Sequence, residues 1–371
     1  MNNKWPAKVR PSADEVSVKP TNVIVVGAGI VGASIAYHLA RQGAQVTVVE
    51  QASPGSGVTR HSFAWINPHG EFPAAARPLR SLALADYRRL QQELPQLQIQ
   101  WTGALTYAET GPDSTDTDTQ GPMSSAHWID RDRIGALEPN LQELPQRARY
   151  APGEGSLDPV ATTQTLLEGA RAHGARVLTQ TPVQGLLVEG RRVLGITTAA
   201  GPYLAEHIVL AAGCATPALL APLGIQLPVQ ASPSILIRFD APRGLVKTLV
   251  SNSLLEIREA ADGSLLAAED YIDDSGPQGP EAIAQQAMAT IRRLFRGAEK
   301  IALRSVEVGL RPMPCDQLPI IGPSQQYLGL YLAVMHAGVT LAPTVGRLVS
   351  QELLLGQCSA ELASCRPARL G

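Results

Sequence analysis

A glycine-rich turn near the N-terminus has the spacing of a site that binds a dinucleotide. In VVGAGIVG, Gly27, Gly29 and Gly32 follow an apolar run and open a segment with helical spacing. The first glycine permits a tight turn, the second lets the backbone approach a pyrophosphate, and the third lets the helix close on the sheet. The N-terminus of that helix then faces the phosphates. We therefore expect the whole turn to bind pyrophosphate, including Ala28, Ile30 and Val31 between the glycines.

A carboxylate follows where a bound ribose requires one. Glu50 ends the next apolar run, 50 − 32 = 18 residues after the last glycine. A carboxylate at this position accepts hydrogen bonds from the ribose hydroxyls and repels a 2′-phosphate. The ligand is therefore expected to be FAD or NAD and not NADP. The alternative is a structural turn beside a solvated glutamate.

The elements that must position these groups can be inferred from periodicity. Residues 22–26 form an apolar run typical of a buried strand, 30–42 have a helical apolar face, and 46–50 form a second strand. Together they predict the strand-turn-helix-strand unit of a parallel α/β fold. Near the C-terminus, the pattern predicts a strand at 330–334, a glycine loop, and a helix at 342–355 with Thr340 as a possible cap.

The middle of the chain is less regular. We expect helices at 82–94 and 159–173, the second with Asp158 as its N-cap and Pro159 at its first position. Residues 103–126 are polar and rich in turn residues, which indicates a surface excursion. Further strands are expected at 176–178, 183–201 (as a hairpin), 207–212, 234–239 and 253–258.

Composition excludes several classes of protein. The 31 basic and 33 acidic residues give a net charge of −2, which argues against a nucleic-acid surface or a polybasic membrane patch. The four cysteines, Cys214, Cys315, Cys358 and Cys365, form no CxxC pair, so we expect no metal and a reducing compartment. Residues 1–20 lack an apolar core and are expected to be a loose tail rather than a signal peptide. With no predicted transmembrane segment, the expected location is the cytoplasm.

Four further segments resemble the glycine oxidase / D-amino-acid oxidase family of flavoenzymes. They are ASPGSGVTRHSFAW (52–65), VLAAGCAT (209–216), VGLRPMPCDQLPIIGP (308–323) and YLAVMHAGVTLAP (331–343). The resemblance spans nearly the whole chain in the family's order, and it implies FAD rather than NAD. It adds the following residues to the expected FAD site: Gln51, Ser56, Gly57, Thr59, Arg60, His61, Ser62, Val183, Ala212, Gly213, Arg311, Gly338, Val339, Thr340 and Leu341.

The resemblance also implies a fold and a division of the chain. The expected fold class is α/β, with a Rossmann-like FAD-binding domain of the glutathione-reductase type built from discontinuous segments, and a substrate domain with a mixed or antiparallel sheet. The FAD-binding domain is expected to comprise residues 21–85, 150–227 and 304–365, and the substrate domain residues 86–149 and 228–303.

Three side chains are expected to act at the reacting centre. Arg311 lies in the Gly-Leu-Arg-Pro segment, whose arginine binds the substrate carboxylate in the family, because a guanidinium forks two hydrogen bonds onto a carboxylate. An ion pair with Glu307 is the alternative. His61 in GVTRH resembles the histidine that bonds covalently to flavin in dimethylglycine and sarcosine dehydrogenases, but we expect a noncovalent contact with the flavin, with the covalent bond as the alternative. His336 precedes the closing loop and is expected to contact the substrate.

The implied activity is FAD-dependent oxidation of a primary or secondary amine or amino acid. Hydride passes from Cα to flavin N5, and the resulting imine hydrolyses in water. The alternatives are oxidation of a 2-hydroxy acid and a role as the flavin-binding subunit of a larger redox complex. Oxygen, a quinone or a carrier protein could accept the electrons, and the oligomeric state is left open. The pocket departs from the family at Met335-His336-Ala337, which makes glycine a doubtful substrate, and Trp65, His69 and Tyr271 are further pocket candidates.

Overall fold

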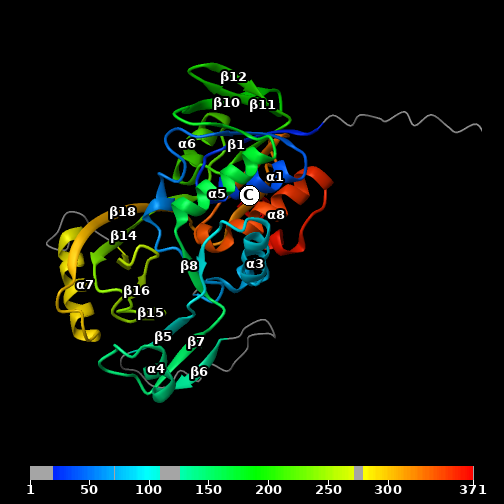
Figure 1. The fold of residues 1–371 in the computed structure, drawn as a ribbon. Helices are drawn as coiled ribbons and strands as arrows, with labels where there is room; N and C mark the ends of the chain where they lie inside the picture. The colour runs from blue at the N-terminus through cyan, green and yellow to red at the C-terminus, as the bar shows by residue number, and fades with distance from the viewer. Residues whose placement is uncertain (1–19, 71, 109–125, 271–278, 371) are drawn as a thin grey trace, which may run out of the picture.

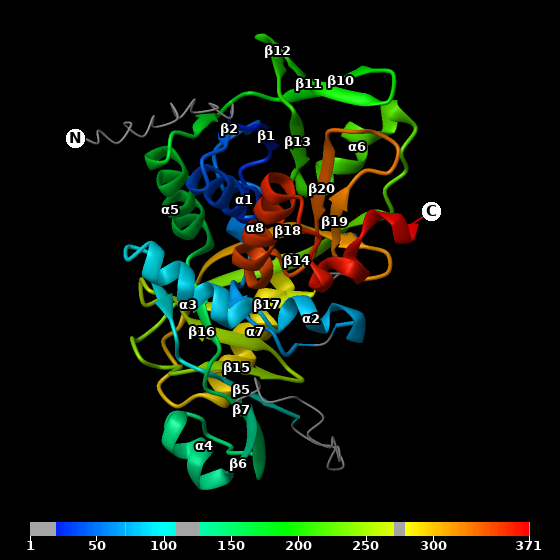
Figure 2. The ribbon, with the colours of Figure 1, turned by 90° about the vertical axis from the view of Figure 1, so that its right-hand side faces the viewer.

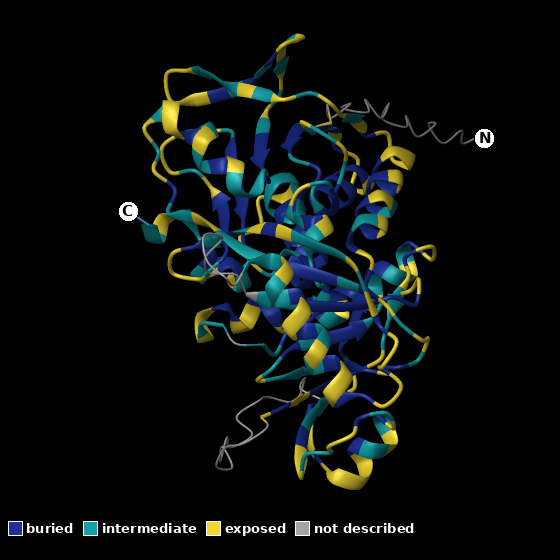
Figure 3. Ribbon diagram, turned by 90° about the vertical axis from the view of Figure 1, so that its left-hand side faces the viewer, coloured by how far each residue is buried: buried dark blue, intermediate teal, exposed yellow. Residues whose placement is uncertain are grey.

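Two large sheets, one above the other in Figure 1, form the framework of the molecule. The computed structural model describes residues 20–70, 72–108, 126–270 and 279–370. A six-stranded sheet with its helices lies in the upper half of Figure 1, and an eight-stranded sheet lies in the lower half. Figure 3 shows that the central strands of both sheets are buried while most exposed residues lie on outer helices and loops.

The six-stranded sheet is parallel except at one edge. Its order is β19 (Ile320–Pro323), β20 (Leu330–Val334), β13 (His207–Leu210), β1 (Asn22–Val26), β2 (Gln45–Val49) and β9 (Arg176–Leu178), with only β19 antiparallel to its neighbour. The central strands are runs of Val, Ile and Leu because both faces are covered. Helices α1 (Ile30–Arg41), α5 (Pro159–Ala172) and α8 (Gly338–Leu355) lie side by side on one face (Figure 2). The hairpin layer of β10 (Val183–Glu189), β11 (Arg192–Thr198) and β12 (Gly201–Leu204) packs on the other.

The eight-stranded sheet is antiparallel except for one pair. Its order is β18 (Ala302–Pro314), β14 (Val229–Asp240), β17 (Leu265–Asp270), β16 (Glu256–Glu259), β15 (Leu249–Asn252), β5 (Ala104–Tyr107), β7 (Arg147–Ala151) and β6 (His127–Asp130), and only β15 and β5 run parallel. Helix α7 (Pro280–Leu294) buries Ala284, Ala287, Ile291 and Leu294 in the core of this half. Their spacing of three and four residues places them on one helical face.

Several short elements complete the fold. They are the small sheet of β3 (Trp65–Ile66), β8 (Gly155–Leu157) and β4 (Ile99–Gln100), and the helices α2 (Arg77–Arg80), α3 (Ala83–Glu93), α4 (Arg131–Leu137) and α6 (Thr216–Leu220). None of the helices in the ranges described here is long and apolar enough to cross a membrane.

The expected α/β fold class is confirmed, and the glycine turn lies between β1 and α1 as predicted. The Asp158 carboxylate accepts hydrogen bonds from the Val160 and Ala161 amides and so caps α5 as expected.

The prediction of a surface excursion at 103–126 is wrong at its start, because Ala104–Tyr107 forms β5. Residues 109–125 lie outside the described part of the chain. The strand expected at 253–258 is instead Glu256–Glu259. The strand 302–314 forms the edge of the eight-stranded sheet, although residues from 304 onward were expected to belong with the FAD-binding segments.

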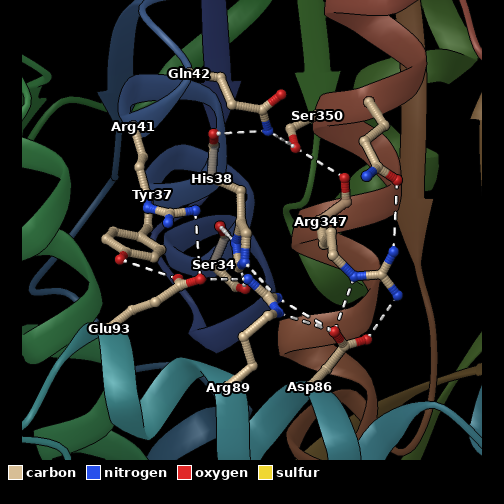
Figure 4. A network of polar contacts seen from close by, with 11 residues as sticks. Ser34, Tyr37, His38, Arg41, Gln42, Asp86, Arg89, Glu93, Arg347 and Ser350 are labelled. Atoms are coloured by element: carbon tan, nitrogen blue, oxygen red, sulfur yellow. Dashed lines mark hydrogen bonds and ion pairs between the residues drawn. The ribbon is translucent and has the colours of Figure 1, made fainter.

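A buried polar network joins α1, α3 and α8 (Figure 4). His38 is 2 % exposed, its Nδ1 lies 2.8 Å from the Ser34 carbonyl oxygen, and its Nε2 lies 3.2 Å from an Arg89 nitrogen. Because a guanidinium only donates, Nε2 must accept, and the proton is assigned to Nδ1, which donates to the carbonyl. Asp86 bridges the helices by accepting from Arg347 and Arg89. The network therefore requires a neutral imidazole.

This requirement makes stability depend on pH. Burial lowers the pKa of His38 from 6.5 to about 4. Above pH 6.5 the residue is neutral in both states, whereas between pH 6.5 and 4 the unfolded chain takes up the proton first. The free energy of unfolding should therefore fall by about 3 kcal/mol across this window through His38 alone. Urea unfolding at pH 7.5 and pH 4 should show that His38→Gln loses this part of the pH dependence while the exposed His173→Gln keeps it. Equal pH dependence in the two variants would contradict the assignment.

Candidate active site

A cavity of about 1640 Å³ lies between the two sheets. Its walls come from the β1–α1 turn, the segment after β2, the end of β13, strands β14, β16, β17 and β18, and the junction of β20 and α8. Pockets for drug-sized ligands are about 300–1,000 Å³, so this cavity has room for a dinucleotide and a small second molecule. It lies at the carboxyl ends of β1, β2, β13 and β20, which is where ligands bind in parallel sheets.

The glycine turn has the close contacts that a dinucleotide site needs. Gly27 has φ +101°, and a Cβ there would lie 2.6 Å from the Ala211 carbonyl oxygen. A Cβ on Gly32 would lie 2.1 Å from the Gly27 carbonyl oxygen, so only glycine lets α1 approach the turn this closely. Gly29 is the N-cap of α1 and lines the cavity. The three glycines thus fit the roles that their spacing predicts.

Glu50 is held at the wall of the cavity by backbone amides. Its two carboxylate oxygens accept hydrogen bonds from the Ala28 amide at 2.7 Å and the Ala52 amide at 2.9 Å. A carboxylate oxygen accepts more than one hydrogen bond, so Glu50 keeps acceptor capacity for ribose hydroxyls. Ala28 itself does not line the cavity, because its contribution is the amide that orients Glu50.

Nearly all the other residues expected at the cofactor share this cavity. Those that line it are Ile30, Val31, Gln51, Ser56, Gly57, Thr59, His61, Ser62, Val183, Ala212, Gly213, Arg311, Gly338, Val339, Thr340 and Leu341. Gly32 and Arg60 do not. Gly32 acts through the helix contact already described, and Arg60 has a side chain 51 % exposed and lies 3.7 Å from Glu307.

The helix that follows β20 begins earlier than predicted. Helix α8 starts at Gly338 rather than 342, after Ala337 with φ +56°, and Pro343 lies inside it. Thr340 is not a cap, because its hydroxyl donates to the Trp65 carbonyl oxygen and accepts from the Asn67 amide. The amides that precede Leu341 have no partner within the helix, and their residues line the cavity. This helix N-terminus therefore gives the cavity wall a partial positive charge.

Pro343 leaves one backbone carbonyl of α8 without its usual helical donor, and a side chain of another helix donates to it instead. A proline has no N–H, so the Val339 carbonyl oxygen lacks its partner four residues on. The Tyr87 hydroxyl of α3 donates to that oxygen, and Tyr87 is fully buried. Its burial raises the pKa of the hydroxyl, which stays protonated as a donor.

Tyr87→Phe should therefore lower the free energy of unfolding by about 1–3 kcal/mol, because a buried carbonyl loses its only added donor. Chemical denaturation measures the change. Tyr203→Phe on the half-buried strand β12 is the control and should change stability by less than about 0.5 kcal/mol. A Tyr87→Phe protein as stable as the parent would show that the Val339 carbonyl finds water instead.

Arg311 extends from β18 into the cavity wall. Its Nη2 donates to the Ser232 hydroxyl at 3.0 Å and to the Pro233 carbonyl at 3.2 Å, across the β14–β18 ladder. These contacts orient the guanidinium. Glu307, considered above as its ion-pair partner, lies instead beside His61 and Arg60.

His61 packs against the same strand. A Cβ on Gly309 would lie 2.6 Å from the His61 Cβ, so the glycine allows the histidine to sit directly on β18. His61 Nδ1 lies 3.0 Å from a Glu307 carboxylate oxygen. Burial lowers the pKa of His61, against the opposing effect of Glu307. The structure thus brings His61, Arg311 and His336 to one cavity.

Among the other pocket candidates, Trp65 lines the cavity, and His69 lies behind it. The buried Glu154 accepts from the Trp65 indole and lies 2.8 Å from His69 Nδ1. Tyr271 lies outside the described residues. Sequence reasoning missed several lining residues: Asn67, Phe72, Arg80, Asn252, Glu256 and Glu269. They belong to no motif, and only the fold brings them together.

Comparison with known proteins identifies the class. A family model described as FAD dependent oxidoreductase matches residues 22–352, so the chain belongs to this family. It is 26 % identical to the glycine oxidase of Bacillus licheniformis, over 91 % of this chain and 94 % of that protein. It is 28 % identical to a D-amino acid dehydrogenase of Cereibacter sphaeroides, over 88 % of this chain and 90 % of that protein. The fold matches L-proline dehydrogenase from P. horikoshii with a TM-score of 0.86 and 20 % identity, covering 95 % and 98 % of the two chains.

The protein is thus an FAD-dependent oxidoreductase. The cavity fits this cofactor, since it combines a glycine turn with space for a pyrophosphate, an oriented carboxylate, and the N-terminus of a second helix in its wall.

Proposed function

We propose that the chain oxidises an α-amino acid with a primary or secondary amine, holding its carboxylate on Arg311. The observation that carries this proposal is that the guanidinium, oriented by Ser232 and Pro233, lines the same cavity as the glycine turn. A guanidinium binds a carboxylate through two parallel hydrogen bonds, and this fixes the direction of the adjacent Cα–H bond.

Bound FAD supplies the redox chemistry by accepting the hydride that leaves Cα. The chain's own residues bind and orient. Arg311 holds the carboxylate, Glu50 and the glycine turn hold the nucleotide, and the first amides of α8 give the cavity wall a partial positive charge. The substrate enters with a neutral amine. Loss of the hydride from Cα and of a proton from nitrogen leaves an imine, which hydrolyses in water to a carbonyl compound and ammonia or an amine. Orientation and electrostatics therefore carry the catalysis.

Three matched compounds test this proposal with a dye as electron acceptor. The amino acid should be oxidised, while the amine that lacks its carboxylate and the corresponding 2-hydroxy acid should not. Turnover of the hydroxy acid alone would favour the alternative reaction. No turnover of any free small molecule would favour a subunit that relays electrons.

We propose further that His61 contacts the cofactor without a covalent bond. Its Nδ1 lies 3.0 Å from a Glu307 carboxylate oxygen. His61 belongs to the loop after β2 and Glu307 to β18, and residues of both segments line the cavity. After acid precipitation of the yellow protein, the colour should pass into the supernatant. Colour that stays in the pellet of the parent and is released from His61→Ala would establish the covalent bond instead.

A further inference from the structure

Arg80 is a buried cation in the wall of the cavity, distinct from the residues that hold the nucleotide and the first carboxylate. It ends helix α2, is 7 % exposed, and lines the cavity together with Asn67 and Phe72. Its Nε donates to the Pro68 carbonyl at 3.3 Å, and its Nη2 donates to the Asn67 carbonyl. Its guanidinium carbon lies 4.1 Å from the centroid of the Phe72 ring. All these partners are neutral.

Among the residues with described positions, no carboxylate lies within 4.0 Å of the Arg80 guanidinium. Glu154 interacts with the Arg80 guanidinium electrostatically at longer range, and its carboxylate already contacts Trp65 and His69. Burial lowers the pKa of Arg80 to about 10. A buried charge without a paired opposite charge is costly, and an anionic ligand would offset that cost.

The position of Arg80 points to the substrate rather than to the nucleotide's phosphates. Its partner Asn67 donates its amide to Thr340, in the first turn of α8, whereas Glu50 follows β2 and accepts from the Ala28 amide of the β1–α1 turn. Arg311 enters from β18, on a different element. Two other acids that line the cavity, Glu256 and Glu269, belong to different elements from Arg80, namely β16 and β17. A guanidinium has five donors, and the two bonds to carbonyls leave others for an anion.

We propose that Arg80 binds a second carboxylate of the substrate, which is therefore an amino dicarboxylate: an α-amino acid with another carboxylate on its side chain or on its nitrogen substituent. This inference rests on the proposed function, since it takes Arg311 as the site of the first carboxylate.

Ligand binding to the holoenzyme tests the inference without turnover. Succinate and glutarate are titrated against their monoamides, succinamate and glutaramate, and the change in the flavin absorbance spectrum is followed. The diacids should bind at least about 10-fold more tightly than the monoamides, because each monoamide replaces one charged acceptor by a neutral group. Arg80→Gln should remove this preference and leave monoamide binding within about 3-fold, while Arg80→Lys should keep part of it.

The control variant is Arg88→Gln, since Arg88 stacks on Trp101 as Arg80 stacks on Phe72 but is exposed. It should keep the full preference. Equal affinities of diacid and monoamide in the parent protein would overturn the inference, and so would a preference that survives in Arg80→Gln. If diacid and monoamide bind equally to the parent and Arg311→Gln weakens the binding of both, the proposed function stands. Only the inference that Arg80 binds a second carboxylate is then rejected. If neither ligand changes the spectrum, the proposed function falls with it.

Discussion

Replacing Arg311 with glutamine should lower kcat/KM for the amino acid by about 1,000-fold while FAD stays bound. Glutamine cannot form the forked, charged pair, and removing one partner of a buried charge pair costs about 2–5 kcal/mol. The loss of a fixed Cα–H direction adds to this effect. The guanidinium donates to a neutral hydroxyl and a neutral carbonyl on β14, so we expect the change to stay local.

Steady-state kinetics with a dye acceptor measure the change. The control is Arg304→Gln, on the same strand, where Arg304 is 43 % exposed and pairs with Asp240 and Asp262 outside the cavity. It should stay within about 3-fold of the parent. An Arg311→Gln enzyme with unchanged kcat/KM would mean that the carboxylate binds elsewhere.

Gly32→Ala should abolish FAD binding and lower the free energy of unfolding by at least about 3 kcal/mol. The new Cβ would lie 2.1 Å from the Gly27 carbonyl oxygen, which belongs to the backbone and cannot rotate away. Helix α1 must therefore move off the turn, and overpacking of this kind costs about 1–3 kcal/mol or more even in adaptable cores. The displaced helix also withdraws the Gly29 end of the site from the phosphates.

The ratio of flavin to protein absorbance and a thermal melt report both effects. Gly279→Ala is the matched control, because Gly279 precedes α7 with φ −62° and nothing lies within 4 Å of its added Cβ. It should keep the flavin and the melting temperature. A yellow, equally stable Gly32→Ala protein would show that the contact between turn and helix is not needed for binding.

The nucleotide half of the site was predictable because its chemistry is local. Gly27, Gly32 and Glu50 lie within one strand-turn-helix-strand unit, and their spacing along the chain fixes their spacing in space. Hydrophobic periodicity located β1 and α1 for the same reason.

What the sequence did not reveal depends on long-range contacts. The start of α8 was placed at 342 because Pro343 resembles a first helical residue, yet the Tyr87 hydroxyl, distant in sequence, compensates for a proline inside the helix. Strand β5 was missed because it is held between two strands that follow much later in the chain, β7 and β15. Arg80 has no local signal at all, since its burial and its place in the cavity come from α2 packing beneath the loop that carries Asn67.

The visible absorbance of the purified protein during anaerobic addition of amino acids tests most directly whether the protein oxidises an amino acid held by its carboxylate. We expect flavin bands that bleach with an α-amino acid and persist with the same compound lacking its carboxylate. Flavin bands that no amino acid bleaches, or that bleach equally without the carboxylate, would contradict it.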